Sequence, residues 1–448
     1  MGLVRFGIGG VVILTLACGG GTLPPTEGAR VEAATETSAD DLDSLVRRAV
    51  EAHRAGAFDE ALELSLRAEQ LLPGHPRLLF NTACALLATG DPDGSLDRLE
   101  RIAAIQVTLD LESSDCLAPL RGHPRFLAVA EAMAALAEPV ERSAVAFTVP
   151  DSTFLVEGVA VDPATGELLL SSLYQRRIVR VAADGRTEPL TKPDDELWSM
   201  LGMAIAPDGR SLWTVTVASP RMQDAAPDEP LRSALLRISL ADGRVLARFD
   251  PPAGLASSAL DSVAVAADGT VFVSDSGAGA IHRLVPGGDG LEVLVEPGSF
   301  ISTQGLALSA DGRMLWAADY GRGVAAVDPD SGRLRFLDHS GPSLVGIDGL
   351  ERHGADLIAI QNGIEPPRVV RIVLGDEGTS VARVELLERA HRLYREPTLG
   401  VVVGDELLYV AASQWRSFDD EGRLLLDELV EPVILRLPLG GTAPGVAR

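Results

Sequence analysis

The sequence is poor in cysteine, in aromatic residues and in basic residues. It has 3 cysteines in 448 residues and no Cys-x-x-Cys pair, so a zinc or redox motif of that kind is excluded. Aromatic residues make up 4%, which argues against a surface that stacks on sugars. The 39 Lys and Arg residues face 64 Asp and Glu, which gives a net charge of -25. Such a surface repels phosphate backbones, so we expect no nucleic-acid partner.

Familiar catalytic motifs are also missing. The sequence has no P-loop, no dinucleotide fingerprint, no Gly-x-Ser-x-Gly elbow and no His-Glu-x-x-His. The 7 histidines are scattered, and none is identified as a general base, although His282 falls in an expected strand. No apolar stretch after residue 20 is long enough to span a bilayer. The absence of these motifs leaves open whether the protein is an enzyme.

A short unit that recurs six times predicts the fold. Each copy has an opening residue, a small residue and an apolar–x–apolar run, followed by a turn and two further apolar strands. Period-two alternation with such a repeat is typical of a β-propeller, and six copies predict six blades. The opening residues are Glu157, Leu201, Asp261, Gln304, Asp348 and Leu399.

The third strand of most copies carries an arginine. These arginines alternate with apolar neighbours, so we expect them to point between blades or to solvent and to pair with carboxylates of adjacent blades. They are Arg180, Arg237, Arg283, Arg371 and Arg436. Blade six shows only three strands, and we expect residues 144–149 to supply its outer strand and so to close the ring.

The N-terminal 18 residues resemble a bacterial lipoprotein signal, with Arg5 before an apolar run that ends at Cys18. The resemblance implies lipidation of Cys18, although Thr15 stands where that class prefers an aliphatic residue. Residues 19–41 are rich in Gly, Pro, Glu and Thr, which indicates a flexible tether. We expect an exported protein, held by a lipid anchor at the periplasmic side of a bacterial membrane. An ordinary signal peptide is the alternative.

Residues 42–137 have helical periodicity and resemble tetratricopeptide repeats, with two repeats at 42–75 and 76–109 and a capping helix. Their function is either a groove for a protein partner or a spacer. Cys84 lies in an apolar helical run, so we expect a buried thiol, and a disulfide with Cys116 is the less favoured interpretation. The fold class is thus a short all-α repeat followed by an all-β six-bladed propeller at 144–440.

In a propeller the innermost strands start at one end of the central channel, so the opening residues meet at its mouth. Glu157, Asp261, Gln304 and Asp348 would bring carboxylate and amide oxygens together there. Such a set needs a cation, protons or water, and oxygen ligands favour calcium or magnesium over zinc. We therefore predict these four residues as a divalent-cation site.

Two long insertions, residues 218–233 in blade two and 413–431 in blade six, also fall at the mouth. They flank the blade that carries Glu157, so they are either a lid over the site or ordinary loop variation. The amide-rich segments that end the second strands of blades five and six are candidate ligand contacts, with a turn or cap role as the alternative. They contain Gln361, Asn362, Gln414 and Trp415.

The runs around Glu157-Gly158, Gln304-Gly305 and Asp348-Gly349 resemble propellers of the regucalcin and gluconolactonase type. That resemblance covers residues 150–438 and implies a metal-dependent hydrolase of lactones, with Glu157 and Asp348 as carboxylate ligands. Gln304 and Leu260 stand where that family carries asparagines, and leucine cannot bind a metal. We therefore favour a propeller that binds a small molecule or a protein at its mouth. A divalent-metal lactonase or esterase is the alternative.

Overall fold

The computed structural model describes residues 42–182, 184–192, 197–226, 229–255, 257–419 and 421–440. Within them the chain divides into two compact units, a helical unit up to Ala137 and a β unit from Glu138 onward. The expected signal segment, Cys18 and the expected tether lie outside the described residues. Among the described helices, none has both the length and the apolar character needed to cross a membrane.

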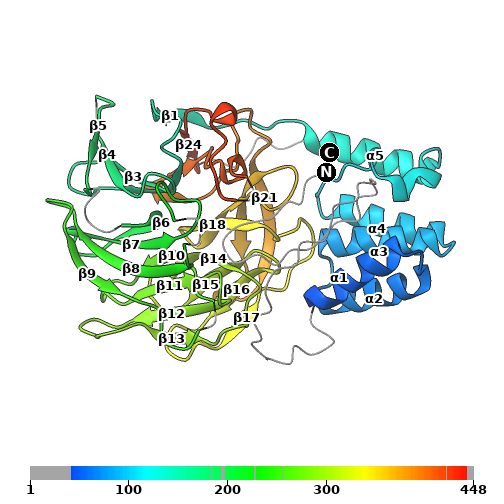
Figure 1. The fold of residues 1–448 in the computed structure, drawn as a ribbon, viewed down its shortest axis with the longest axis horizontal. Helices are drawn as coiled ribbons and strands as arrows, with labels where there is room; N and C mark the ends of the chain where they lie inside the picture. The colour runs from blue at the N-terminus through cyan, green and yellow to red at the C-terminus, as the bar shows by residue number, and fades with distance from the viewer. Residues whose placement is uncertain are drawn as a thin grey trace. The chain divides into compact units, whose positions relative to one another are not determined.

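The helical unit follows the predicted helix pairs. Its elements are α1 (Leu42–Arg54), α2 (Phe58–Leu71), α3 (Pro76–Ala88), α4 (Pro92–Ala104), a 3-10 helix η1 (Asp115–Leu120) and α5 (Pro124–Ala137). Proline opens α3, α4 and α5, where its missing N–H costs little. Asp91 caps α4 by accepting a hydrogen bond from the Gly94 backbone N–H at 2.9 Å. Helix α1 packs on α2, and α3 packs on α4 (Figure 1).

The expectation of a free thiol at Cys84 is wrong. Cys84 is buried on α3, as expected, but it is bonded to Cys116 of η1 in a disulfide. Helix η1 packs against α3, and this contact brings together two cysteines that are 32 positions apart. Because the residues around Cys116 are polar, the sequence pattern did not indicate that η1 packs against α3.

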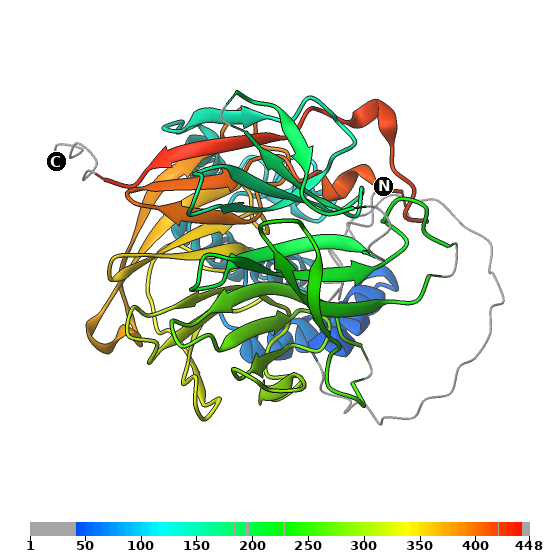
Figure 2. The ribbon, with the colours of Figure 1, turned by 90° about the vertical axis from the view of Figure 1, so that its left-hand side faces the viewer.

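The β unit is a six-bladed propeller, as predicted, built from six four-stranded sheets (Figures 1 and 2). Blades one and two are β2 (Val156–Val161), β3 (Leu168–Ser172), β4 (Ile178–Val181), β5 (Thr187–Pro189), β6 (Ser199–Ile205), β7 (Ser211–Ala218), β8 (Arg232–Ser239) and β9 (Val245–Phe249). Blades three and four are β10 (Leu260–Val265), β11 (Val271–Asp275), β12 (Ala280–Leu284), β13 (Glu292–Val295), β14 (Thr303–Leu308), β15 (Leu315–Asp319), β16 (Gly323–Val327) and β17 (Leu334–Phe336).

Blade five is β18 (Ile347–His353), β19 (Asp356–Gln361), β20 (Arg368–Leu374) and β21 (Val381–Arg389). Blade six is β22 (Gly400–Val403), β23 (Glu406–Val410), β24 (Val433–Pro438) and, on its outside, β1 (Ala144–Thr148). Figure 2 shows the cyan β1 beside the red β24, and the register pairs Thr148 with Val433. The predicted closure by the segment before blade one is thus confirmed, and it joins the two ends of the ring.

The core of the propeller lies between the blades. Six apolar clusters each join one pair of neighbouring blades, and the ring is complete because one of them joins blade six to blade one. In that cluster Val156 and Leu170 of blade one pack with Ile434 of blade six. Leu260 is fully buried in the cluster between blades two and three, so it is a core residue.

The small residue of the repeat is needed where one blade meets the next. A Cβ atom on Gly158 would lie 2.6 Å from the Leu201 carbonyl oxygen, and one on Gly305 would lie 2.5 Å from the Leu350 nitrogen. Real Cβ atoms do not approach backbone atoms so closely. Gly202 meets the following blade in the same way. Each glycine therefore lets two inner strands touch, which draws the opening residues together around the channel.

Arg180, Arg283 and Arg371 reach the neighbouring blade as predicted, but the carboxylate partners of the third-strand arginines are not the predicted ones. Their carboxylate partners come from the same blade, for example Asp162 for Arg180 and Asp356 for Arg371. The neighbouring blade supplies backbone carbonyl oxygens instead, such as that of Leu240, which accepts from Arg180 at 2.9 Å. The reason is geometric, because an arginine on the third strand lies beside the turn that joins the first two strands of its own blade.

Candidate functional site

The opening residues lie at β-bulges at the channel mouth. In blades one to five the pairing of the innermost strand with the second strand shifts by one residue at the opening residue. In blade one, Val156 pairs with Ser172, whereas Val159 pairs with Leu170. A bulge leaves one residue outside the ladder and turns its side chain, and such bulges are common beside binding sites. In these five blades the repeat therefore sets the opening residue apart from the ladder, although Leu201 of blade two packs into the apolar cluster between blades two and three.

Glu157 is the most enclosed carboxylate of the mouth, with 5% of its surface exposed. Its Oε2 accepts a hydrogen bond from the indole Nε1–H of Trp415 at 2.7 Å. Burial raises the pKa of Glu157 well above its usual value, and the nearby charges of Asp348 and Asp261 raise it further. The Trp415 hydrogen bond acts in the opposite direction but does not compensate.

Asp348 is held by a chain of neutral groups. Its Oδ2 accepts from the Asn362 amide at 2.5 Å, and the Asn362 oxygen accepts from the Tyr320 hydroxyl at 2.8 Å. Burial raises the pKa of Asp348 to about 8, and the negative charges of Asp261 and Glu396 add to the shift. The Asp348 side chain keeps some exposure to solvent, but protein atoms surround most of it. The loss of solvent on burial therefore remains the main cause of its raised pKa.

Asp261 completes a group of three carboxylates. Its Oδ1 accepts from the Ser262 hydroxyl at 3.1 Å. Burial raises its pKa to about 6, with a further contribution from the charge of Asp275. Asp275 itself accepts from the buried His282 at 3.0 Å and from the Ala259 backbone N–H at 2.9 Å. His282 therefore anchors a loop-binding aspartate and does not reach the channel.

Glu396 is a fourth carboxylate of the mouth that the repeat did not predict. It lies three positions before Leu399, the apolar opening residue of blade six, and its charge raises the pKa of both Glu157 and Asp348. It is partly compensated, because its Oε1 pairs with Arg416 at 2.9 Å. An acidic residue just before an apolar opening residue was the available sequence signal.

We call Glu157, Asp261, Asp348 and Glu396 the mouth carboxylates. Within the described residues, no ion pair joins Glu157, Asp261 or Asp348 to a basic side chain; their hydrogen-bond donors are neutral. Burial is the main cause of the raised pKa of each of the three, and the charge of Asp261 raises the pKa values of Glu157 and Asp348 further. The mouth thus holds negative charge that protons or an added cation must balance.

The predicted metal ligands share this region but do not converge on one point. Across the described ranges, no three Asp, Glu, His or Cys side chains lie close enough together to hold a metal ion. Gln304 donates its amide N–H to Ser302 at 2.9 Å. The oxygen donors have the right chemistry for calcium, but their positions do not form a ligand set, so the bound cation stays a prediction.

The four predicted ligand contacts divide into two pairs. Asn362 and Trp415 hydrogen-bond the mouth carboxylates. Gln361 is fully buried. Its amide N–H groups donate to the Ser343 and Val345 carbonyl oxygens, and its amide oxygen accepts from Arg368. Gln414 donates to and accepts from the backbone of Val430. Gln361 therefore supports a loop, and Asn362 and Trp415 lie at the mouth. Gln414 both holds its loop and lines a cavity beside the mouth, so its contact with a ligand stays a prediction.

The two insertions meet beside Glu157. Arg221 of the first lies over the ring of Trp415 in the second, with its guanidinium carbon 5.5 Å from the ring centroid. It also lies 5.9 Å from the ring centroid of Phe418. A Cβ on Gly422 would touch Pro220, so the two loops pack closely. They flank the mouth as predicted, and movement of these loops as a lid stays a prediction.

A cavity of about 360 Å³ adjoins the mouth carboxylates at blades five and six. Asn362 and Glu396 belong both to its wall and to the mouth, and the wall also contains Glu365, Arg395 and Arg416. Its volume is in the range of small-molecule sites. The cavity gives a ligand of modest size room beside the carboxylates.

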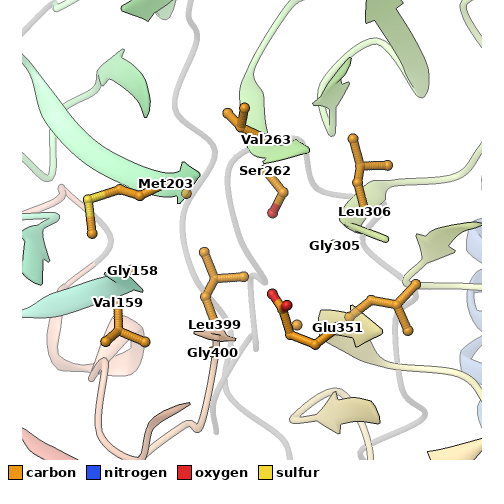
Figure 3. Close-up of a pocket in the computed structure, with 13 residues that line it drawn as sticks. Gly158, Val159, Met203, Ser262, Val263, Gly305, Leu306, Glu351, Leu399 and Gly400 are labelled. Atoms are coloured by element: carbon orange, nitrogen blue, oxygen red, sulfur yellow. The ribbon is translucent and has the colours of Figure 1, made fainter. Parts of the chain in front are cut away.

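The inner channel is much narrower. Figure 3 shows the Glu351 carboxylate turned toward the space between the inner strands, together with Ser262 and Leu399. The cavity there measures about 30 Å³, which is room for very little beyond a water molecule. Burial raises the pKa of Glu351 to about 8. A ligand that approaches from the mouth therefore cannot pass through the ring.

No family model matches the chain, and no curated protein matches its sequence. Solved structures similar to it include a gluconolactonase from Xanthomonas campestris, with 17% identity, a TM-score of 0.45 and coverage of 68% of this chain and 100% of that chain. A calcium-binding regucalcin from Agrobacterium tumefaciens has 18% identity, a TM-score of 0.46 and coverage of 65% and 93%. A virginiamycin B lyase from Staphylococcus aureus has 15% identity, a TM-score of 0.44 and coverage of 64% and 82%. These similarities do not assign an activity to this chain.

Proposed function

We propose that this protein is a binding propeller whose channel mouth takes the positively charged group of a small polar ligand. The observation that carries the proposal is the group of Glu157, Asp261 and Asp348, which are enclosed and interact with one another but form no ion pair with a basic side chain of the described residues. Removing charges from water is costly unless they are paired. An ammonium or guanidinium group of a ligand would supply the missing charge.

The adjoining cavity of about 360 Å³ supports a small ligand over a bulky one. Its wall carries both signs of charge, with Arg395 and Arg416 beside Glu365 and Glu396. A polar or zwitterionic body suits such a wall better than an apolar one. The ligand would place its cationic end at the mouth and its polar remainder in the cavity.

Proton release should accompany this binding. The pKa of Asp348 is raised to about 8, so at neutral pH this carboxyl is mostly protonated. A cation binds the ionised form, so the proton must leave first. Affinity is therefore expected to increase from pH 6 to pH 9.

Isothermal titration of the full chain with putrescine at pH 6 and pH 9 tests the proposal. N,N′-diacetylputrescine is the matched neutral probe and should not bind. Asp348→Asn should weaken putrescine binding at pH 9 by about tenfold or more, since one charge-assisted contact is worth roughly 1.5 kcal/mol or more. Asp356→Asn makes the same change in the same blade beside Arg371 and should leave affinity within about twofold. Equal affinity in the wild type and Asp348→Asn would contradict the proposal.

A divalent-cation-dependent hydrolase of lactones or related esters is the second candidate. The all-oxygen character of the mouth carboxylates favours it, because calcium and magnesium prefer such ligands. The positions of these side chains do not, since no three described Asp, Glu, His or Cys residues converge. Thermal melting with calcium and with manganese tests this candidate. A rise in the melting temperature that Asp348→Ala abolishes would support the metal-dependent hydrolase, and assays with a panel of lactones would follow. No change with either ion would exclude it.

We further propose that the chain is exported and anchored through Cys18. The disulfide between Cys84 and Cys116 supports export, because such bonds persist mainly in oxidising compartments. Metabolic labelling with an alkyne fatty acid should mark the wild type and not Cys18→Ser. The helical repeats are proposed to bind a protein partner, for which co-purification with and without residues 42–137 is the test.

A further inference from the structure

A cluster of three arginines around one tryptophan lies on the mouth face of blades one and two, outside the site described above. It consists of Arg176, which follows β3, Trp198, which precedes β6, Arg232, the first residue of β8, and Arg248 on β9. These positions are where strands start or end at the mouth face. We call them the arginine cluster.

Two of the arginines lie over the indole ring. The guanidinium carbons of Arg248 and Arg232 are 4.3 and 4.7 Å from the Trp198 ring centroid. Both distances are within cation–π range, so the ring holds two positive charges near each other. Like charges at this spacing repel, and an aromatic ring relieves only part of that cost.

Protein carboxylates compensate the cluster incompletely. Arg232 pairs with Glu229 at 2.6 Å, whereas Arg248 reaches Asp250 only through Nε at 3.4 Å. Within the described residues, the terminal nitrogens of Arg248 have no hydrogen-bond partner in the protein. These are the N–H groups that bind oxyanions in a bidentate manner.

Arg176 is fixed in place by backbone oxygens. Its Nε donates to the Leu197 carbonyl at 2.7 Å, and its Nη1 lies 3.4 Å from the Gln223 carbonyl. Its backbone φ of 58° lies in the left-handed region, which is unusual for an arginine. Carbonyl oxygens do not neutralise a guanidinium, so Arg176 adds positive charge that no carboxylate of the described residues pairs with.

The four side chains line a cavity of about 380 Å³. Its wall holds three guanidinium groups, against two carboxylates that pair with them, in a chain whose net charge is -25. We propose that the arginine cluster is a binding site for a small oxyanion, a molecule that carries carboxylate or phosphate groups. The terminal N–H groups of Arg248 and the guanidinium groups of Arg176 and Arg232 bind its oxygens. The site is independent of the mouth carboxylates, which select the opposite charge.

Titration of the full chain at low ionic strength with citrate and with inorganic phosphate tests the proposal and separates its two ligand chemistries. Tight binding of one and not the other identifies the group, and either result supports the site. Succinamide, a neutral probe, should not bind. Arg248→Gln should weaken binding of the preferred anion by about tenfold or more, and Arg232→Gln with Arg248→Gln should abolish it.

Arg244→Gln is the matched control. Arg244 lies in the same blade at the opposite face, pairs with Asp242 and is 75% exposed. This variant should bind the anion within about twofold of the wild type. Melting curves confirm that each variant is folded. An equal loss in Arg244→Gln and Arg248→Gln would show a general charge effect and overturn the proposal.

An acidic segment of the chain itself has the right charge to compete with an anion for the arginine cluster. Asp194, Asp195 and Glu196 precede Trp198 and lie outside the described residues. In a variant with Asp194→Asn, Asp195→Asn and Glu196→Gln, binding at the wild-type level is expected. Binding that appears only in this variant would mean that the cluster serves the chain's own acidic segment, and would overturn the proposal.

Discussion

Among the described residues, the charged side chains of the repeat form ion pairs at one face of the propeller and do not form them at the channel mouth on the other face. At the face away from the mouth, third-strand arginines pair with carboxylates, as Arg180 does with Asp162 at 2.5 Å. At the mouth, Glu157, Asp261 and Asp348 form no ion pair with a basic side chain of the described residues. Both patterns arise from the same repeat, one residue of which opens a blade while another lies on its third strand.

The third-strand arginines therefore help to hold the blades together, whereas the unpaired carboxylates at the mouth are the groups that can bind a ligand. Arg180, Arg283 and Arg371 each bond a backbone carbonyl of the next blade as well as a carboxylate of their own, so their charges are used within the fold. Within the described part of the chain, Glu157, Asp261 and Asp348 hold no blade together through an ion pair; burial raises their pKa values, and the charges of neighbouring carboxylates raise those of Glu157 and Asp348 further. Charge that the fold leaves unbalanced is available to a ligand.

The largest effect is expected from Gly305→Ala, which breaks the contact that brings the mouth together. The new Cβ would lie 2.5 Å from the Leu350 nitrogen, so two blades must separate. We expect a loss of about 3 kcal/mol in the free energy of unfolding, measured in urea. Gly290→Ala, where no atom lies within 4 Å of the new Cβ, should change it by less than about 0.5 kcal/mol. Similar values for the two would refute the packing argument.

The stability of Asp348→Asn should depend on pH less than that of the wild type. The folded pKa of Asp348 is about 8, above the ordinary 3.8, so the folded state holds a proton that the unfolded chain releases. Stability from this proton is complete below pH 4 and is lost as pH rises through 8. Between pH 6.5 and pH 9 the wild type should therefore lose about 2 kcal/mol more than Asp348→Asn, since each pH unit below the folded pKa is worth about 1.4 kcal/mol.

Urea unfolding at both pH values measures this difference. Asp356→Asn, on the ion-paired face, is the control and should keep the slope of the wild type. If Asp348→Asn kept that slope as well, the raised pKa of Asp348 would be wrong.

Arg180→Gln tests the ion-paired face. Arg180 is 19% exposed, pairs with Asp162 and Glu167, and donates to the Leu240 carbonyl. Its loss leaves two carboxylates unpaired, and we expect about 1–2 kcal/mol of destabilisation by chemical unfolding. Arg186→Gln removes an arginine that is 68% exposed and should cost about 0.5 kcal/mol or less. An unchanged free energy of unfolding in Arg180→Gln would contradict a stabilising role for the ion pairs at this face.

Trp415→Phe has the smallest expected effect. It removes the N–H that donates to Glu157 at 2.7 Å and keeps an aromatic ring near Arg221. Since this hydrogen bond favours the ionised carboxylate, its loss raises the pKa of Glu157 further. We expect about 1 kcal/mol of destabilisation at pH 9 beyond that at pH 5.

Trp213→Phe is the control, because Trp213 stacks with Arg237 on the other face. Its cost should not depend on pH. A cost of Trp415→Phe that is equal at both pH values would contradict a role for the indole N–H at Glu157.

The repeat was sufficient to predict the six blades, their closure and three of the four mouth carboxylates, because the opening residue and its small neighbour have a fixed geometric meaning. Glu157, Asp261 and Asp348 lie together because Gly158, Gly305 and their counterparts permit close strands. The loops were not predictable in the same way. Nothing in the repeat indicates that Gln361 binds backbone while its neighbour Asn362 reaches Asp348.

Contacts between distant loops explain the remaining differences. Glu396 enters the mouth from the segment before blade six, and its position depends on the backbone N–H of Arg416. Cys116 pairs with Cys84 because η1 packs on α3. Such contacts are set by tertiary packing, which the local sequence pattern does not encode.

Infrared difference spectroscopy of the carbonyl stretch of protonated carboxylic acids measures whether the mouth carboxylates carry protons and release them to a cationic ligand. At pH 7 the wild type should show this band, and Asp348→Asn should show less of it. Adding putrescine should remove the band in the wild type as protons leave the mouth carboxylates, and diacetylputrescine should not. A wild type without the band at pH 7, or with a band that putrescine leaves unchanged, would contradict a mouth that exchanges protons for a cationic ligand.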